Sequence, residues 1–443
     1  MKSSLTLSAL LLLWPFGTQT SAQTKDTLSA RVDRPPIIDT VMILGNKKTK
    51  DFVILNEMTL KPGMAASLTS IEYDRMRIYS LGLFTRVDID FQRIDSTGYL
   101  IVDVSERWYI IPIPIFGFRD GDPKHPFYGA GVLFSNFRGV NQKLFVEFSF
   151  GADPSAAIEF QDPLFDARNN LSIATALSLA TIKNRSQLES AITGDFDEHH
   201  YDASVQLGKR FSLFETGGVG LAYDVASVTM YRTGRTASPG GRDAYISAVI
   251  NYSFDSRDLR EYAMQGSFAS ASIQQNGFGE SHVSFTRYGI DVREYTPLLR
   301  NLSVAMRAYA SLVTGGTIPT YARAYIGYIN RIRGYYQTIF EGDNSAGGTV
   351  ELRYSLLRAR TLDVTDLPIP EEFARWRLGI SLALFADAGK AWFRGDPLKL
   401  DSIISGYGGG IHILLPYGYV GRIEYAFNDY FKGQLILDLR GSI

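Results

Sequence analysis

The residues best suited to chemistry lie in the segment YINRIRGYYQ, residues 328–337. Arg331 and Arg333 place two permanently charged guanidinium groups among tyrosines, and Gly334 follows the second arginine. A guanidinium group can form two parallel hydrogen bonds with a phosphate or a carboxylate. The segment is therefore a candidate nucleic-acid patch, an exposed loop, or a piece of chain shaped to fit one particular slot.

The overall charge argues against the nucleic-acid interpretation. The chain has 443 residues, and its 45 Lys and Arg and 46 Asp and Glu give a formal net charge of −1. This balance provides no bulk attraction for nucleic acid or for an anionic membrane surface. The chain has no cysteine, which excludes disulfides, thiolate metal sites, thiol nucleophiles and a lipidated N-terminal cysteine.

Residues 194–200, GDFDEHH, are the other segment whose side chains could do chemistry. His199 and His200 beside acidic residues are compatible with a metal site. Adjacent histidines point in different directions in extended chain, however, and no distant third histidine suggests that a site closes. We therefore expect a solvated loop without a metal. Because no Ser/His/Asp order and no phosphate-binding glycine loop stands out, we expect neither an enzyme nor a cofactor.

The N-terminus has the pattern of a secretory signal peptide. Lys2 precedes an apolar run over residues 5–14, and small residues follow up to Ala22. The run is shorter than the ~20 residues with which a helix crosses a bilayer. We therefore predict a signal peptide over residues 1–22 and no transmembrane helix, which leaves a soluble exported protein or an outer-membrane barrel.

Residues 36–106 have the pattern of a small α/β domain. Residues 51–60 predict one helix, and a second is expected from Thr69, because Thr69 and Glu72 have the spacing of a capping box. Strands are predicted at residues 37–44, 86–91 and 99–104. The expected order is strand, helix, helix, strand, strand.

From residue 107 to residue 443, apolar and polar residues alternate in segments broken by turn residues. A β-sandwich would show the same alternation, but many segments are of about ten residues, which exceeds usual sandwich strands and suits tilted membrane strands. The signal peptide, the lack of cysteine and the uninterrupted run of strands also favour a barrel. We predict an all-β transmembrane barrel of about 16 antiparallel strands, preceded by the small α/β domain.

The parity of two late strands places acidic residues inside this barrel. On one strand the residues expected to face lipid are Leu378, Ile380, Leu382 and Leu384. Asp387 on that strand, and Glu351 on the strand before it, then face the lumen. A carboxylate in a narrow, partly dehydrated lumen needs a cation or hydrogen-bond donors, and an arginine supplies both.

Several segments resemble a known family. Residues 43–46 (ILGN), 77–84 (RIYSLGLF) and 104–106 (VSE) resemble a POTRA domain. The barrel region resembles the bacterial outer-membrane assembly and translocation superfamily (BamA/TamA-like, bacterial surface antigen family). The matching segments are Ile332-Arg333-Gly334-Tyr335 for its (V/I)RG(F/Y) signature, Phe385-x-Asp387-x-Gly389 for its F-x-D-x-G motif, residues 347–353, residues 255–258 (DSRD) with Gly266, and residues 415–418 (LPYG).

The resemblance implies a position and partners for the opening segment. In the family the loop that carries this signature folds back into the barrel, and its arginine contacts carboxylates of the lumen. Carried over, Arg333 is the tip of the loop, and Asp387 and Glu351 are its partners. Gly334 would allow a tight turn and Tyr335 would pack on the barrel wall, with Gly389 closing the motif of the neighbouring strand. Arg331 is expected to be solvated.

The resemblance also implies a function and a location. The expected protein inserts or translocates polypeptides at the outer membrane, with one periplasmic POTRA domain over residues 36–106 and a barrel over residues 107–443. Client polypeptides would bind an exposed POTRA edge strand, such as residues 86–91, and the seam between the first and last barrel strands. Outer-membrane lipid and accessory proteins are the other expected partners, and nucleic acid is not.

Two prolines affect the expected seam. Pro112 and Pro114 lie in the segment taken as the first barrel strand, and both lack an N–H on the same strand edge. If that edge faces the last strand, the seam is short of hydrogen bonds. Two other functions stay open on the sequence: a passive porin, and a factor that exports lipid or another surface molecule.

Overall fold

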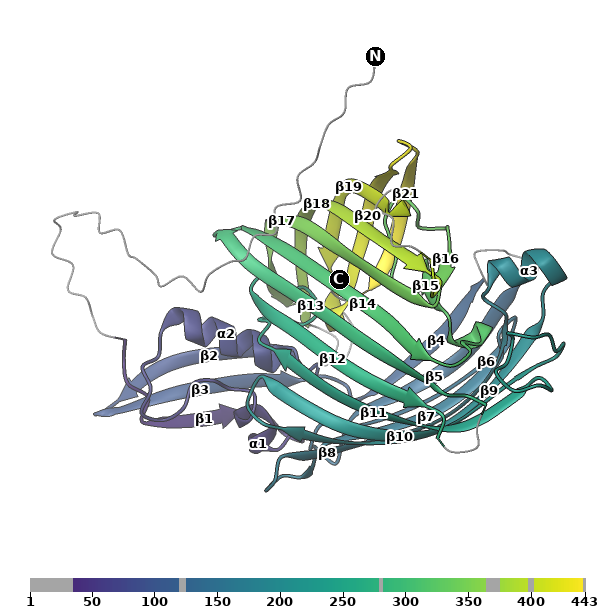
Figure 1. Ribbon diagram of the computed structural model, residues 1–443. Helices are drawn as coiled ribbons and strands as arrows, with labels where there is room; N and C mark the ends of the chain where they lie inside the picture. Colours follow the sequence, from purple (N-terminus) through teal and green to yellow (C-terminus); the bar gives the residue numbers. More distant parts are fainter. Residues whose placement is uncertain (1–34, 119–124, 279–281, 364–374, 397–401, 441–443) are drawn as a thin grey trace, which may run out of the picture. The chain divides into compact units, whose positions relative to one another are not determined.

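The computed structural model describes residues 35–118, 125–278, 282–363, 375–396 and 402–440 (Figure 1). The predicted signal peptide lies outside these residues. The described residues from Pro36 onward belong to one compact unit. Within the described ranges, no helix is both long and apolar enough to cross a membrane.

A three-stranded sheet with two helices forms the N-terminal domain. The central strand β3 (Thr97–Glu106) pairs in parallel with β1 (Thr40–Leu44) and antiparallel with β2 (Phe84–Ile94). The helices are α1 (Asp51–Leu55) and α2 (Leu68–Tyr79). Their apolar faces bury a shared core with the sheet that includes Ile54, Ile78, Leu100 and Val102. The strand β2, which contains the predicted segment 86–91, is an edge of the sheet.

The prediction of a helix over residues 51–60 was wrong in length. Helix α1 ends at Leu55. The backbone N–H groups of Thr59 and Leu60 instead donate to the buried carboxylate of Asp74, each at 2.8 Å. These charge-assisted bonds from α2 hold the two residues out of the helix.

The prediction of the cap of the second helix was also wrong. Helix α2 is capped by Ser67, whose hydroxyl oxygen accepts from the Ser70 N–H at 3.1 Å. Thr69 lies inside the first turn, and Glu72 forms an ion pair with Arg75. Ser67 offers the same hydroxyl acceptor two residues earlier, so spacing alone did not select the correct cap.

In the described residues the second sheet has sixteen antiparallel strands that pair in chain order, with β14 beside β17 because β15 and β16 form a separate hairpin. They are β4 (Ile110–Phe118), β5 (Pro126–Phe137), β6 (Gln142–Gly151), β7 (Ser155–Asp166), β8 (Leu171–Lys183), β9 (Asp197–Arg210), β10 (Glu215–Val228), β11 (Arg242–Asp255), β12 (Gly266–Asn276), β13 (Phe285–Leu299), β14 (Leu302–Gly315), β17 (Asn344–Asp363), β18 (Arg375–Trp392), β19 (Ile404–Leu414), β20 (Val420–Asn428) and β21 (Gly433–Arg440). Figure 1 shows how this sheet curls. In the described residues β4 and β21 are its two ends, and neither pairs with the other.

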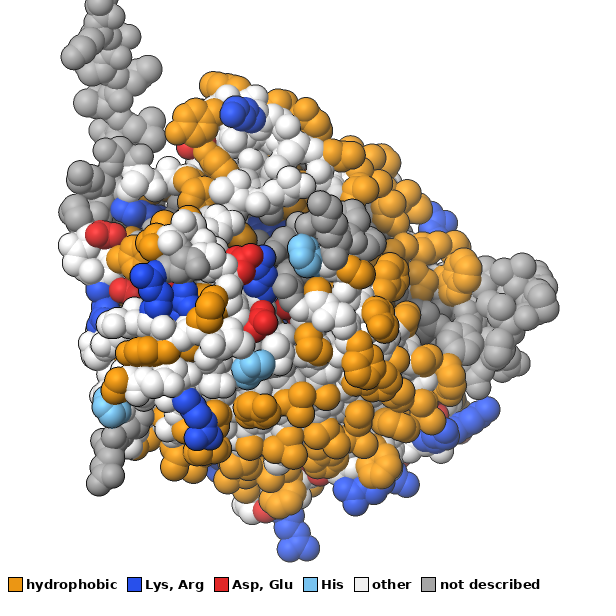
Figure 2. Space-filling model, turned by 90° about the vertical axis from the view of Figure 1, so that its right-hand side faces the viewer, with side chains coloured by type: hydrophobic (Ala, Val, Ile, Leu, Met, Phe, Trp, Pro, Cys, Tyr) orange, Lys and Arg blue, Asp and Glu red, His pale blue; other side chains and the backbone are white. Residues whose placement is uncertain are grey.

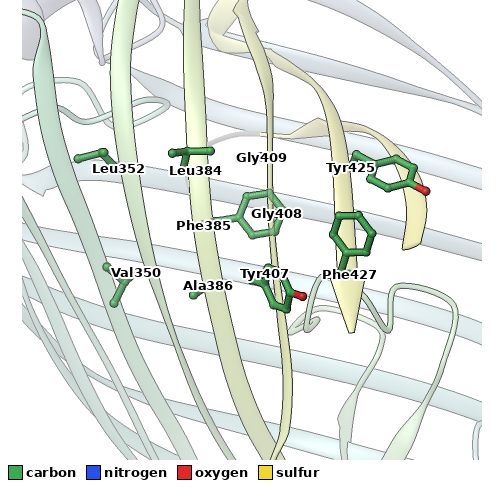
Figure 3. A pocket seen from close by; sticks show the side chains of 10 residues that line it. All are labelled: Val350, Leu352, Leu384, Phe385, Ala386, Tyr407, Gly408, Gly409, Tyr425 and Phe427. Carbon is green, nitrogen blue, oxygen red and sulfur yellow. The ribbon is translucent and has the colours of Figure 1, made fainter. Parts of the chain in front are cut away.

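Alternation along the strands separates an inner from an outer face, as predicted. On β18, Leu382 and Leu384 are exposed, whereas Phe385 and Asp387 are buried. The outer face of β17–β20 is apolar, and Figure 3 shows Leu352, Leu384 and their neighbours along a groove of about 630 Å³. In Figure 2, charged side chains gather toward the left and the middle of the face that is shown, and hydrophobic side chains cover its right-hand and lower parts.

The prediction of a solvated loop at residues 194–200 was wrong for its second half. Strand β9 begins at Asp197 and pairs with β8 and β10, so His199 and His200 lie in the sheet. His199 Nδ1 lies 2.9 Å from Thr181 Oγ1, and His200 Nε2 lies 3.2 Å from Glu198 Oε2. Backbone pairing between β8 and β9 continues to the end of β8, so His199 lies opposite Thr181 and His200 lies opposite Ala180.

Long connections carry the remaining elements. Helix α3 (Gln187–Thr193) lies between β8 and β9. The connection over residues 316–343 contains the helical turn η2 (Thr320–Ala322) and the hairpin of β15 (Ala324–Ile326) and β16 (Phe340–Gly342). Another helical turn, η5 (Pro416–Gly418), joins β19 to β20. The opening segment 328–337 lies between the two strands of the β15–β16 hairpin.

Candidate functional site

The β15–β16 hairpin carries the segment 328–337 against the inner face of β18–β20. Ile332 is buried beside Gly389. Gly334 has a φ of 100°, in the left-handed region that favours glycine, and a Cβ there would lie 2.5 Å from the Phe427 carbonyl oxygen. A Cβ at Gly406 of β19 would lie 1.5 Å from the carbonyl oxygen of Arg333. The close approach of loop and wall therefore requires glycine at position 406.

Arg333 is the centre of a buried ion cluster. Its Nε and Nη2 donate to the two carboxylate oxygens of Asp387, each at 2.8 Å, and its backbone N–H donates to the same carboxylate at 3.0 Å. Its Nη1 donates to Glu351 Oε2 and to Glu424 Oε1, each at 2.8 Å. One guanidinium thus joins carboxylates from β17, β18 and β20. The structure brings together Arg333, Asp387 and Glu351, the residues that the resemblance pairs.

The surroundings of Arg333 favour its charged form. Burial alone would lower the pKa of the guanidinium, but the hydrogen bonds and charge of Asp387, with the charges of Glu351 and Glu424, raise that pKa above its ordinary value. The guanidinium carbon also lies 3.5 Å from the ring centroid of Phe385. Figure 3 shows the Phe385 ring beside Gly408 on the next strand. The first residue of the F-x-D-x-G motif therefore supports the arginine, and the third binds it.

A second set of contacts orients two of these carboxylates. Glu351 Oε1 accepts from Arg353 Nε at 2.8 Å, and Glu424 Oε1 lies 3.0 Å from His412 Nε2. Arg353 and His412 are both fully buried. The opposite ends of these two side chains contact the turn between β11 and β12: Arg353 Nη1 donates to the Ala263 carbonyl at 2.7 Å, and His412 Nδ1 lies 3.0 Å from Tyr262 Oη.

The same cluster has the donor types of a metal site. Glu351, His412 and Glu424 each offer one ligand atom, all within 4.8 Å of one another. Both oxygens of Glu351 already accept from arginines, and Glu424 Oε1 is shared by Arg333 and His412. A metal ion would have to displace a guanidinium group. The arrangement is therefore suited to holding Arg333 rather than a metal.

The other predicted residues of the loop lie close to the last strands. Tyr335 Oη donates to Asp429, and its ring packs edge-on against Phe340 with centroids 5.4 Å apart. Tyr336 Oη donates to Asp438 of β21 at 3.2 Å. The loop therefore contacts both the β20–β21 connection and the terminal strand of the sheet.

The expectation that Arg331 is solvated was wrong. Arg331 is half-buried, its Nε donates to the Tyr328 carbonyl at 2.9 Å, and its guanidinium carbon lies 4.2 Å from the Tyr336 ring centroid. Local contacts within the segment, rather than a carboxylate, bind this arginine.

Pro112 and Pro114 lie in β4, opposite Val132 and Ala130 of β5. Since β4 is an end of the described sheet, these two prolines lie in a strand with one paired edge. Prolines are tolerated in such end strands because one edge of the strand needs no donors.

Sequence reasoning missed four residues of the site: Glu424, His412, Arg353 and Gly406. Glu424 and Arg353 were recognisable as residues of the polar faces of their strands, but not as members of the Arg333 cluster. Alternation along a strand predicts which side chains face the lumen, but it does not predict which of them contact one another across the lumen. The position of the incoming loop decides which lumenal residues meet.

Comparison with known proteins places this geometry in a family. Residues 136–432 match the Omp85 superfamily domain, and residues 36–107 match the POTRA family, the surface antigen variable number repeat. A comparison with curated proteins finds no match.

Solved structures share the fold. BamA from Haemophilus ducreyi lacking POTRA domains 1–3 is 15% identical, with a TM-score of 0.52 over 91% of this chain and 83% of that chain. CdiB from Escherichia coli is 12% identical, with a TM-score of 0.55 over 92% of this chain and 76% of that chain. The Omp85 match spans more than half of the sequence, and it is that match, with the POTRA match before it, that identifies the protein: this chain belongs to the Omp85 superfamily.

Proposed function

We propose that this outer-membrane β-barrel protein inserts or translocates other polypeptides, with the loop over residues 316–343 acting as a latch inside the barrel. The observation that carries the proposal is the ion cluster in which Arg333 binds carboxylates from three strands. These ion pairs fix the loop to the inner face of the sheet. A latch that holds a conduit shut until a client arrives needs a loop fixed in this way.

The two ends of the sheet support a lateral route for the client. Strand β4 carries Pro112 and Pro114, and β4 and β21 do not pair with each other in the described residues. A client strand could pair with the free edge of either strand and fold there. Its folding and burial in lipid would supply the driving force, so no nucleotide or other cofactor is needed.

The POTRA domain offers a second binding edge. Strand β2 is an edge of its sheet, and it contains Asp88 and Asp90, which are exposed. We propose that a client strand adds to β2 by backbone hydrogen bonds on the periplasmic side. A photo-crosslinking residue at Asp90 should capture unfolded barrel proteins, whereas the same residue at the exposed Leu68 of α2 should not. Equal capture at both positions would contradict a role for the edge.

Depletion of the protein, followed by outer-membrane proteomics and lipid analysis, tests the function. The proposal expects a selective loss of membrane or surface polypeptides before any change in lipid composition. A primary change in lipid or in another surface molecule would instead favour an export factor for that molecule. If neither changes, and the purified protein shows a large conductance that POTRA deletion does not alter, the protein is a porin.

A further inference from the structure

The turn between β11 and β12, residues 256–265, reaches both the POTRA domain and the ion cluster. At its inner end, Tyr262 Oη lies 3.0 Å from His412 Nδ1, and the Ala263 carbonyl accepts from Arg353 Nη1 at 2.7 Å. Tyr262 and Ala263 are buried, and the Tyr262 ring lies edge-on to His412 and 4.4 Å from the Arg353 guanidinium carbon. Tyr262 and Ala263 lie outside the DSRD motif, residues 255–258.

The DSRD motif gives the turn its shape. Asp255 accepts from Arg257 Nε at 2.9 Å and from Arg257 Nη2 at 3.1 Å. Asp258 Oδ1 accepts from the backbone N–H groups of Leu259 at 2.8 Å and Met264 at 3.1 Å. The segment between these donors is thereby closed into a rigid loop whose far end carries Tyr262.

Helix α2 of the POTRA domain contacts the outer end of the same turn. Tyr73 Oη donates to the Ser256 carbonyl at 2.8 Å, and Arg77 Nη1 donates to the Asp255 carbonyl at 3.2 Å. The Arg260 N–H donates to Ser80 Oγ, just after α2, at 3.2 Å. Tyr79 packs at the edge of a buried cluster that includes Leu259, Tyr262, Leu414 and Val420. One short turn thus has a POTRA contact at one end and a latch contact at the other.

We propose that this turn transmits the position of the POTRA domain to the loop latch, and that His412 and Arg353 are the positioning residues that receive it. The proposal rests on the proposed function, because it names how the latch of that conduit is held. His412 orients Glu424 and Arg353 orients Glu351, and both carboxylates bind Nη1 of Arg333. A shift of the turn therefore moves two of the three carboxylates that hold Arg333. The hydrogen bonds of Asp387, the third carboxylate, run to Arg333 rather than to the turn, so this residue anchors the loop independently.

The direction of the effect follows from the geometry. With the POTRA domain docked on the turn, Glu351 and Glu424 are aimed at Arg333 and the loop is held in the lumen. If a client displaced α2 from the turn, His412 and Arg353 would lose their fixed partners. Arg333 would then keep its bidentate bond to Asp387, but the orientation of Glu351 and Glu424 would no longer be fixed. The loop would be docked less firmly.

The test is a distance measurement on the loop in purified full-length protein without client. Spin labels are placed at Ile329 of the loop and at Tyr430 of the β20–β21 connection, which are 84% and 73% exposed. The chain has no cysteine, so Ile329→Cys and Tyr430→Cys give one labelled pair. Pulsed electron paramagnetic resonance then reports the docked and displaced populations of the loop.

Three variants are compared in this labelled protein. Tyr262→Phe removes only the hydroxyl that contacts His412, and should lower the ratio of docked to displaced loop about fivefold. Tyr73→Phe removes the hydroxyl that donates from the POTRA domain to the Ser256 carbonyl and also lies close to Arg77, and should lower the ratio about twofold. Ser247→Ala removes a strand-to-strand hydrogen bond to Asp224 that touches neither loop nor turn, and should leave the distances unchanged.

The double variant Tyr262→Phe with His412→Phe should displace the loop no further than His412→Phe alone, because His412→Phe already removes the contact with Tyr262 as well as the one with Glu424. Heat-modifiable gel mobility confirms that each variant is a folded barrel. If Tyr262→Phe keeps the original distances in a folded barrel, the turn does not hold the latch and the proposal is wrong. If Tyr262→Phe displaces the loop and Tyr73→Phe does not, the link to the POTRA domain is wrong. Both distances are measured without a client, so these results are independent of the experiment that tests the transport function.

Discussion

Arg333 carries an unusually large share of the interactions of the lumen. Its guanidinium and backbone N–H make five hydrogen bonds to Asp387, Glu351 and Glu424, and it stacks on Phe385. Removing one partner of a buried ion pair costs about 3–5 kcal/mol, because the other partner stays buried without compensation. Here three carboxylates would lose the same cation. The cluster therefore has one stable occupant, and the loop is fixed by it.

Exchanging the charges of Arg333 and Asp387 tests this pairing. Arg333→Asp and Asp387→Arg should each abolish most activity, because each brings like charges together in the lumen. The double variant should recover part of it, since the new pair is opposite in sign but the new aspartate faces Glu351 and Glu424. Activity is measured by surface or outer-membrane levels of client polypeptides. Arg168→Asp, in an exposed turn, is the matched control, and a double variant no better than the worse single one would argue against direct pairing.

Substitution of Gly406 should disturb the docking of the loop as strongly as substitution of the charged residues of the cluster. A Cβ at this position would lie 1.5 Å from the Arg333 carbonyl oxygen, so Gly406→Ala must push the loop away from β19. We expect the loop to become accessible to added protease in a barrel that is still folded. In Gly421→Ala the new Cβ meets only ordinary contacts, at 3.6 Å and beyond, and the loop should stay protected. Protection in both variants would mean that the loop is not held at β19.

At the scale of elements, the two ends of the sheet and the turn at 256–265 are expected to have different roles. The ends, β4 and β21, leave one strand edge free each in the described residues, and the loop reaches β21 through Tyr336 and Asp438. The turn is closed by carboxylates of its own DSRD motif and faces the POTRA helix α2. Opening of the barrel wall and release of the loop are therefore expected to involve separate elements that meet at β20 and β21.

A disulfide between β4 and β21 tests the lateral route. One cysteine is placed in β4 and one in β21, and several such pairs are compared. Because the chain has no other cysteine, a disulfide can form only between the two introduced residues. Oxidation should block client insertion, and reduction should restore it, because a closed wall offers no free strand edge. A cysteine pair between β9 and β10, which are already paired, serves as the control. Full activity of the oxidised β4–β21 protein would exclude lateral opening as the mechanism.

The turn should also make stability depend on pH. Burial raises the pKa of the Asp258 carboxyl to about 6, against hydrogen bonds from backbone N–H groups that lower it. Because the folded pKa lies above the unfolded one, the folded protein binds the proton more tightly, and the contribution to stability falls as pH rises from about 4 to 6. Asp258→Asn mimics the protonated form and should remove this dependence. The gain in unfolding midpoint of Asp258→Asn over the native protein should therefore be larger at pH 7.5 than at pH 4.5, and an equal gain would contradict the assignment.

At the scale of the whole molecule, the sequence predicted the architecture better than the contacts. Periodicity indicated the sixteen-stranded sheet, and parity put Asp387 and Glu351 on its inner face. The cap of α2 was misassigned because Ser67 and Thr69 offer the same chemistry two residues apart. Glu424, His412 and Arg353 were missed as a cluster because their meeting depends on how the sheet curls and on two segments that enter it. The alternation of polar and apolar residues along one strand predicts neither the curl of the sheet nor the path of the entering segments.

The family and the site together give one account of the molecule. The chain is an Omp85 protein whose Arg333 loop is held by strands β17, β18 and β20, with a POTRA domain in contact with the turn that supports two of the carboxylates. We propose that the barrel acts on polypeptides and that the docked loop is needed for this action.

Reconstitution of the purified protein in lipid vesicles tests that claim most directly. An unfolded outer-membrane barrel protein is added, and its insertion is followed by heat-modifiable mobility and protease resistance. The native protein should accelerate insertion well above empty vesicles, whereas Arg333→Ala should lose most of that acceleration and Arg168→Ala should keep it. Insertion at the same rate in empty vesicles, with the native protein and with Arg333→Ala, would contradict the account.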